Sequence, residues 1–176
     1  ITFAAAKRLT DSEKVDFTKY LLESNLRKSS AVIERMDFGL IFSDFLDSAK
    51  NKPQLIQTIL DFIYENNNLF PGNFFDFPRE LLTILTIYEH RACLEVLAQE
   101  ENESKTRSLL GKIISIETCS TKFYFGNYFE TLNLVRQISE ESDNKPDYKE
   151  KVDRLGKMLL GLDPNNLSLP FHDSLE

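Results

Sequence analysis

The chain has 176 residues, of which 41% are hydrophobic and 28% are charged, and its formal net charge is -7. This composition is typical of a globular protein, and the size suits one domain or a segment of a longer helical array. Every apolar run is shorter than the roughly 18 residues of a membrane-spanning helix, so we expect no transmembrane segment. The chain begins Ile1-Thr2-Phe3 and shows no signal-peptide pattern, and we expect it to be part of a larger protein.

Negative charge is concentrated in the middle third of the sequence. Residues 1–52 contain 9 basic and 8 acidic side chains, residues 53–104 contain 2 and 9, and residues 105–176 contain 10 and 11. The respective net charges are therefore +1, -7 and -1. The middle third would repel a polyanion, so we expect no nucleic-acid partner and favour a protein with a basic surface. The basic residues between Lys149 and Lys157 alternate with carboxylates, which is typical of a solvated helix face.

Two helices are expected within the first 50 residues. Thr10 and Glu13 have the spacing of a capping box, in which each side chain binds the backbone amide of the other, so a helix begins here and continues to about Lys28. Ser29-Ser30 can cap a second helix that ends near Lys50. Its buried face is predicted from three- and four-residue spacing at Phe38, Ile41, Phe42, Phe45 and Leu46.

A third helix and an unusual loop follow. Pro53 suits the first turn of the helix, and the run Asn66-Asn67-Asn68 is expected to end it. Its inward positions are Leu55, Ile56, Ile59, Leu60 and Ile63. Residues 69–78 then read Leu-Phe-Pro-Gly-Asn-Phe-Phe-Asp-Phe-Pro, a sequence whose turn residues forbid a continuous helix although it contains four phenylalanines. These rings either form a plug beneath the neighbouring helices or include an exposed anchor for a partner.

The position of each ring separates the two interpretations. Phe70 and Phe77 flank the adjoining helices and are expected in the core, so a plug is favoured for the loop as a whole. Phe74 and Phe75 follow Pro71-Gly72 directly and are the candidate anchors, because exposed aromatic side chains ringed by polar groups are typical of binding hot spots. The predicted partner-binding residues are Phe74, Phe75, Asn73, Asp76 and Arg79.

A fourth helix is expected from the Asp76 cap and Pro78 to about Gln99. Its first half is apolar nearly all round, which predicts that it is enclosed at the centre of the packing. Residues 100–104 are polar and interrupt the helical pattern. A fifth helix is expected after them, and it ends near Ser120. Its inward positions are Leu109, Leu110, Ile113, Ile114 and Ile116.

Two further helices complete the chain. Asn127 and Glu130 have the spacing of a second capping box, and Pro146 suits the start of the last helix. The predicted inward positions are Leu132, Val135 and Ile138 in the first of these helices, and Val152, Leu155, Met158 and Leu159 in the second. Gly161, followed by Asp163-Pro164, predicts a glycine cap at its end. The fold class is therefore all-α, with about seven helices arranged as an irregular bundle or as a short armadillo- or HEAT-like stack of helical pairs. We expect residues 1–162 to form a single domain and residues 163–176 an extended tail.

Few residues point to chemistry. His90 and Cys93 are three positions apart and could face a metal together, but two ligands are short of a closed zinc site, and we interpret them as a rim histidine beside a buried thiol. The sequence contains neither a phosphate-binding glycine loop nor a Ser-His-carboxylate pattern. We therefore expect no metal, no cofactor and no enzymatic activity. Two cysteines, Cys93 and Cys119, suit a reducing compartment and favour the cytoplasm.

Several pieces between residues 95 and 138 resemble a helical stretch of the exchange domains that act on Ras-type GTPases. They are Glu95-Val96-Leu97, Lys112 to Ile116, Cys119 and Asn127 to Leu132. The resemblance needs gaps and covers about a quarter of the chain. It implies a helical regulator of a small GTPase. Nothing in the sequence matches the inserted helical hairpin by which that family opens its GTPase, which puts exchange activity itself in question.

Three hypotheses about function follow. The favoured one is a helical protein–protein interaction module that binds through the aromatic loop, with the acidic middle third steering a basic partner. The first alternative is a membrane-surface module that inserts the same rings, although Arg79 is the only cation near the loop and anionic lipid would meet carboxylates. The second alternative is the GTPase regulator. Membrane binding is not expected, and the sequence leaves the oligomeric state open.

Overall fold

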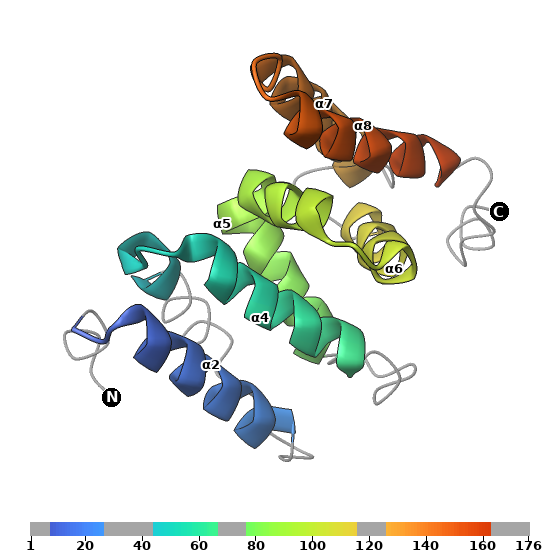
Figure 1. The fold of residues 1–176 in the computed structure, drawn as a ribbon. Coiled ribbons are helices and arrows are strands. Elements are labelled where there is room, and N and C mark those ends of the chain that lie inside the picture. Colours follow the sequence, from blue (N-terminus) through green and yellow to red (C-terminus); the bar gives the residue numbers. More distant parts are fainter. Residues whose placement is uncertain (1–7, 27–43, 67–76, 116–125, 163–176) are drawn as a thin grey trace, which may run out of the picture. The chain divides into compact units, whose positions relative to one another are not determined.

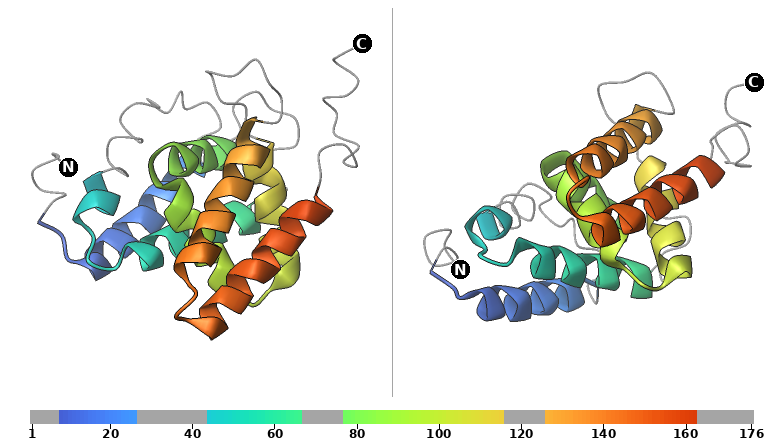
Figure 2. Two further views of the ribbon diagram at one scale, coloured as in Figure 1. Left: turned by 90° about the horizontal axis from the view of Figure 1, so that it is seen from above. Right: turned by 45° about the horizontal axis from the view of Figure 1, so that its top comes forward.

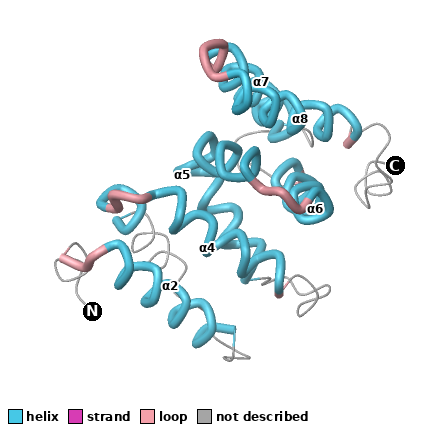
Figure 3. The backbone as a smooth tube through the Cα atoms, viewed as in Figure 1, coloured by secondary structure: helices cyan, strands magenta, loops and turns pink. Residues whose placement is uncertain are grey.

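A computed structural model describes residues 8–26, 44–66, 77–115 and 126–162. Every regular element in these ranges is helical, which confirms the all-α prediction (Figures 1 and 3). The helices are α2 (Asp11–Leu26), α4 (Lys52–Glu65), α5 (Phe77–Gln99), α6 (Glu103–Ile114), α7 (Gly126–Glu141) and α8 (Pro146–Gly161). Residues 44–48 are also helical. None of the described helices is both long and apolar enough to cross a membrane.

The chain forms two compact units, residues 1–88 and residues 89–176, and the boundary falls inside α5. A single domain over residues 1–162 and a helical-repeat arrangement both stay predictions. The predicted tail, residues 163–176, lies outside the described residues.

The core of the first unit follows the predicted spacing. Helices α2 and α4 pack against each other (Figure 2). All five inward positions predicted for the third helix are buried in α4, namely Leu55, Ile56, Ile59, Leu60 and Ile63. Phe45 and Leu46 are buried as predicted, and the ring of Phe17 meets Phe45 edge to face at a centroid distance of 5.8 Å. The other three positions predicted for that face lie outside the described residues.

Helix starts in the first unit are fixed by polar side chains. The Thr10 amide donates to Glu13 at 2.7 Å and the Glu13 amide donates to the Thr10 hydroxyl at 3.3 Å, which confirms the first capping box. Asp11 also accepts hydrogen bonds from the backbone amides of Lys50 and Asn51, at 3.0 and 2.5 Å. These two bonds lower the pKa of Asp11 and tie the start of α2 to the residues just before α4.

In the second unit, α7 packs against both α8 and α6, and α7 and α8 lie alongside each other in both views of Figure 2. Most of the predicted inward positions are buried, in α6 (Leu109, Leu110, Ile113, Ile114), in α7 (Val135, Ile138) and in α8 (Val152, Leu155, Met158, Leu159). Leu132 of α7 is only half-buried, and Ile116 lies outside the described residues. Pro146 begins α8 as predicted. The spacing therefore predicts the buried faces of α6 and α8 correctly over the described residues, and that of α7 in part.

The predicted glycine cap of the last helix is wrong. Gly161 is the final helical residue, and the cap is Leu162, with φ of -96°. The Leu162 amide donates to the carbonyl oxygens of Met158 and Leu159 at 3.1 and 3.0 Å. Because these bonds satisfy the helix end with right-handed dihedral angles, no left-handed glycine is needed.

Helix α5 differs from its prediction in two ways. Glu89 has non-helical dihedral angles (φ -139°, ψ 40°), so the helix is kinked there. The apolar first half is enclosed only in part, since Leu81, Leu82 and Leu85 are buried, whereas Ile87 is 67% exposed and Tyr88 is 55% exposed. An apolar residue at every turn predicts burial only if neighbours cover every face, and the described part of the chain leaves the side chains of Ile87 and Tyr88 exposed.

Candidate functional site

The predicted partner-binding residues fall mostly outside the described structure. Phe74, Phe75, Asn73 and Asp76 belong to residues 67–76, and for Arg79 only the backbone, in the first turn of α5, is described. The aromatic loop as a binding site therefore stays a prediction. The described surface nearest to it in the sequence is the exposed face of α5.

We name Ile84, Ile87 and Tyr88 the α5 stripe. Spacings of three and four residues place these side chains on one face of the helix. Ile84 is partly exposed, and more than half of each of the other two side chains is in contact with solvent. Contiguous exposed apolar patches, unlike single exposed apolar residues, often mark surfaces that bind another molecule. The apolar residues of the stripe are visible in the sequence, but an apolar pattern on all sides of a helix predicts enclosure and not an exposed face.

A buried polar network joins three helices of the second unit. The Nε2 atom of His90 on α5 lies 2.9 Å from Oγ1 of Thr131 on α7, and the Thr131 hydroxyl donates to the carbonyl oxygen of Asn127 at 2.5 Å. The side-chain amide of Asn127 donates to the carbonyl oxygen of Ile113 in α6 at 2.9 Å. Because His90, Thr131 and Asn127 are all buried, these bonds replace water at positions where an unpaired polar group would be costly.

This network corrects the second predicted capping box. Asn127 lies inside α7, which begins at Gly126, and its side chain is directed to α6. There it satisfies one of the last four carbonyl groups of α6, which have no partner inside their own helix. Sequence spacing could not reveal this role, because Ile113 is 14 residues away and the bond depends on how α6 and α7 pack.

The surroundings of His90 and Cys93, the two residues that could face a metal together, differ in part from the prediction. Cys93 is a free buried thiol, as predicted, and burial raises its pKa to about 12, so the thiol is protonated near neutral pH. His90 is buried, not at the rim, since only 8% of it is exposed. Among the described residues, no three His, Cys, Asp or Glu side chains are arranged to hold a metal ion.

Burial also acts on the charge of His90. Loss of hydration lowers the pKa of the imidazole below its ordinary 6.5, and the carboxylate of Glu130 opposes this effect. The Glu130 Oε1 atom lies 3.7 Å from Nδ1 of His90, and its own side chain is 60% exposed. The histidine therefore has one nitrogen in the buried network and the other directed to a carboxylate at the surface.

Arg91 forms an ionic link beside this network. Its Nε atom donates to Glu95 at 2.9 Å, and its two terminal nitrogens donate to the two carboxylate oxygens of Glu141. These bonds raise the pKa of Arg91 and lower that of Glu141. The link connects α5 with the last residue of α7, although such exposed pairs contribute little to stability.

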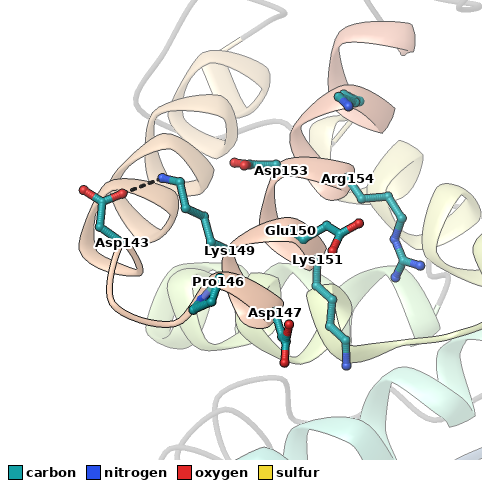
Figure 4. A pocket seen from close by; sticks show the side chains of 9 residues that line it. Asp143, Pro146, Asp147, Lys149, Glu150, Lys151, Asp153 and Arg154 are labelled. Atoms are coloured by element: carbon teal, nitrogen blue, oxygen red, sulfur yellow. Dashed lines mark ion pairs between the residues drawn. The ribbon is translucent and has the colours of Figure 1, made fainter.

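A charged depression of about 900 Å³ lies along α8 and the turn before it (Figure 4). Its charged lining is balanced, with Lys149, Lys151, Arg154 and Lys157 against Asp143, Asp147, Glu150 and Asp153. Figure 4 shows Lys149 and Asp143 directed toward each other, at an N–O distance of 2.8 Å. Lys151 donates to Gln99 and Arg154 to the Glu100 carbonyl oxygen, both at 3.0 Å. The lining residues therefore have zero net charge, and three of the four cations are bonded within the unit, as is typical of a solvated helix face.

Comparisons with protein-family models, with curated proteins and with solved structures found no significant match. The resemblance to GTPase exchange domains stays a prediction.

Proposed function

We propose that this chain is a cytoplasmic, helical protein–protein interaction module that binds a partner with a basic, partly apolar surface. The observation that carries the proposal is the α5 stripe, in which Ile87 and Tyr88 expose most of their side chains within an acidic part of the chain. An apolar anchor supplies affinity when it is desolvated, and the surrounding charge selects the partner and speeds association.

The charge near the stripe supports a basic partner. Residues 53–104 contain 9 acidic side chains and 2 basic ones, Arg79 and Arg91. Arg91 is bonded to Glu95 and Glu141, so its charge is largely balanced within the second unit. In the part of this segment that belongs to the first unit, residues 53–88, Asp61, Glu65, Asp76 and Glu80 outnumber the single cation, Arg79, so a basic partner of the stripe is favoured.

The aromatic loop is proposed as a second anchor of the same module. Phe74 and Phe75 come just before α5, and the helix from Phe77 to Tyr88 extends about 16 Å at 1.5 Å per residue. A single helical segment of a partner is long enough to contact both ends of this stretch. The anchors would then be Phe74 and Phe75 at one end and the α5 stripe at the other.

The test uses a fluorescent peptide with leucines at helical spacing and lysines at the other positions, and measures binding by anisotropy. The chain should bind this peptide, and should bind an acidic peptide of the same pattern far more weakly. Replacing both stripe residues (Ile87→Ser with Tyr88→Ser) should weaken binding about 30-fold, the loss of a typical hot spot. The loop variant Phe74→Ser with Phe75→Ser should weaken it as well.

Tyr20→Ser is the matched control, because Tyr20 is 64% exposed on α2, in the third of the chain with net charge +1. This variant should bind like the unmodified chain. Equal weakening by Tyr20→Ser, or equal binding of the acidic peptide, would exclude specific recognition by the stripe. Sedimentation with anionic vesicles that depends on Phe74 and Phe75 would favour the membrane alternative instead. Accelerated nucleotide release from a Ras-type GTPase would favour the GTPase regulator.

A further inference from the structure

The hydrogen-bond partners of His90 determine which of its two ring nitrogens carries the proton when the ring is neutral. A threonine hydroxyl has one proton, and that of Thr131 is donated to the Asn127 carbonyl oxygen at 2.5 Å. The Thr131 oxygen must therefore accept the hydrogen bond that links it to Nε2 of His90 at 2.9 Å. It follows that neutral His90 has its proton on Nε2 and a lone pair on Nδ1.

That lone pair is directed to another acceptor. Nδ1 lies 3.7 Å from Glu130 Oε1, with no proton to share between them. While the ring is neutral, the contact between Nδ1 and the Glu130 carboxylate therefore contributes little to stability. A second proton on the ring would enter at Nδ1, opposite the carboxylate, and would leave the buried bond to Thr131 intact.

We propose that His90 and Glu130 form a proton-operated contact between α5 and α7. When Nδ1 takes up a proton, two facing acceptors become an ion pair, which closes to a charge-assisted N–H···O hydrogen bond as the N–O distance shortens from 3.7 Å, and the imidazolium then donates from both nitrogens. When Nδ1 loses this proton, the two acceptors face each other again without a hydrogen bond. His90 directly follows Glu89, the non-helical residue of α5, so the contact acts at the point where this helix changes direction.

The other charged groups near His90 have different partners or no charge. Its neighbour Arg91 is bonded to Glu95 and Glu141, and Glu89, on the other side, acts on Cys93. Cys93 stays protonated, and α6 approaches the network through the Ile113 carbonyl oxygen. Within the described ranges, Glu130 is the charged side chain that acts on the imidazole.

The test is a pH titration of the histidine ring nitrogens by ¹⁵N NMR. The chain has only two histidines, so His172→Gln leaves His90 as a single signal. Its neutral form should show the Nε2–H tautomer, and its midpoint should lie below pH 6.5, because burial lowers the pKa. A neutral ring protonated on Nδ1 would overturn the proposal.

Glu130→Gln, made in the His172→Gln chain, tests whether the Glu130 carboxylate itself, and not the net charge of the protein, shifts the titration midpoint of His90. It should move the His90 midpoint to lower pH, because the amide no longer stabilises the imidazolium. Glu140→Gln removes the same charge ten residues further along α7, about 15 Å away, and should leave the midpoint in place. Equal shifts in the two variants, or no shift in Glu130→Gln, would show that Glu130 is not the partner.

Discussion

Replacing Thr131 with valine tests the buried network most directly. Valine has nearly the shape of threonine, so Thr131→Val removes the hydroxyl from a position with 0% exposure and leaves little cavity. The N–H of His90 then has no acceptor at a site that is 8% exposed. Leaving one buried donor unpaired costs about 1–3 kcal/mol. We expect a decrease of this size in the free energy of unfolding, measured by urea denaturation with far-UV circular dichroism.

Thr106 provides a matched control. It is 1% exposed in α6, and its hydroxyl donates to the Asn102 carbonyl oxygen at 3.1 Å, four residues earlier, as Thr131 does in α7. That carbonyl also accepts the Thr106 amide at 3.0 Å, so Thr106→Val leaves no group unpaired. We expect it to cost clearly less than Thr131→Val, about 0.5–1 kcal/mol.

A double-mutant cycle completes this test. In a His90→Phe background the donor is absent, so Thr131→Val should cost about 1 kcal/mol less than it does in the unmodified chain. Equal costs in the two backgrounds, or a cost for Thr106→Val as large as for Thr131→Val, would refute the inferred donor and acceptor roles.

Three further predictions concern other parts of the structure. Gly111→Ala should raise the free energy of unfolding by about 0.5–1 kcal/mol in urea denaturation, because a Cβ there meets nothing within 4 Å and alanine favours a helix interior; a decrease would mean that α6 needs the glycine. In a Cys119→Ser chain, the remaining thiol, Cys93, should stay unmodified by an alkylating reagent at pH 8 until denaturant is added, since it is buried with a pKa of about 12, and fast alkylation of the folded chain would contradict that burial. The free energy of unfolding should fall as the pH drops from about 6.5 through the lower pKa of folded His90, because the unfolded chain binds more protons in that window. His90→Phe should remove this slope, whereas the lowered pKa values of Asp11, Glu13 and Glu141 act only at more acidic pH.

Spacing along the sequence was enough to predict what each helix buries. The faces of α4, α6 and α8 follow the three- and four-residue repeat of apolar side chains, and the first capping box needs only residues three positions apart. These features are local, so each can be found without knowing which helix lies next to which.

The candidate sites depend on information that spacing does not contain. Nothing local distinguishes Asn127 as a cap from Asn127 as a partner of α6, and nothing local shows that His90 is buried, because its partner Thr131 is 41 residues away. For α5, the spacing of apolar residues shows which positions are apolar but not which face has neighbours. It therefore predicts enclosure for Ile87 and Tyr88, although both are exposed. Tertiary packing decides all three cases.

The kink in α5 also affects how the two units unfold. The helix supplies Leu81, Leu82 and Leu85 to the core before Glu89, and Cys93, Leu94 and Leu97 to the core after it. Each part is no longer than about 12 residues, a length at which an isolated helix is marginal in water, so each part depends on its own unit for stability. Because Glu89 interrupts the helical dihedral angles between them, loss of one part need not spread to the other. Although α5 is continuous in the sequence, we expect its two parts to unfold separately, each with its own unit.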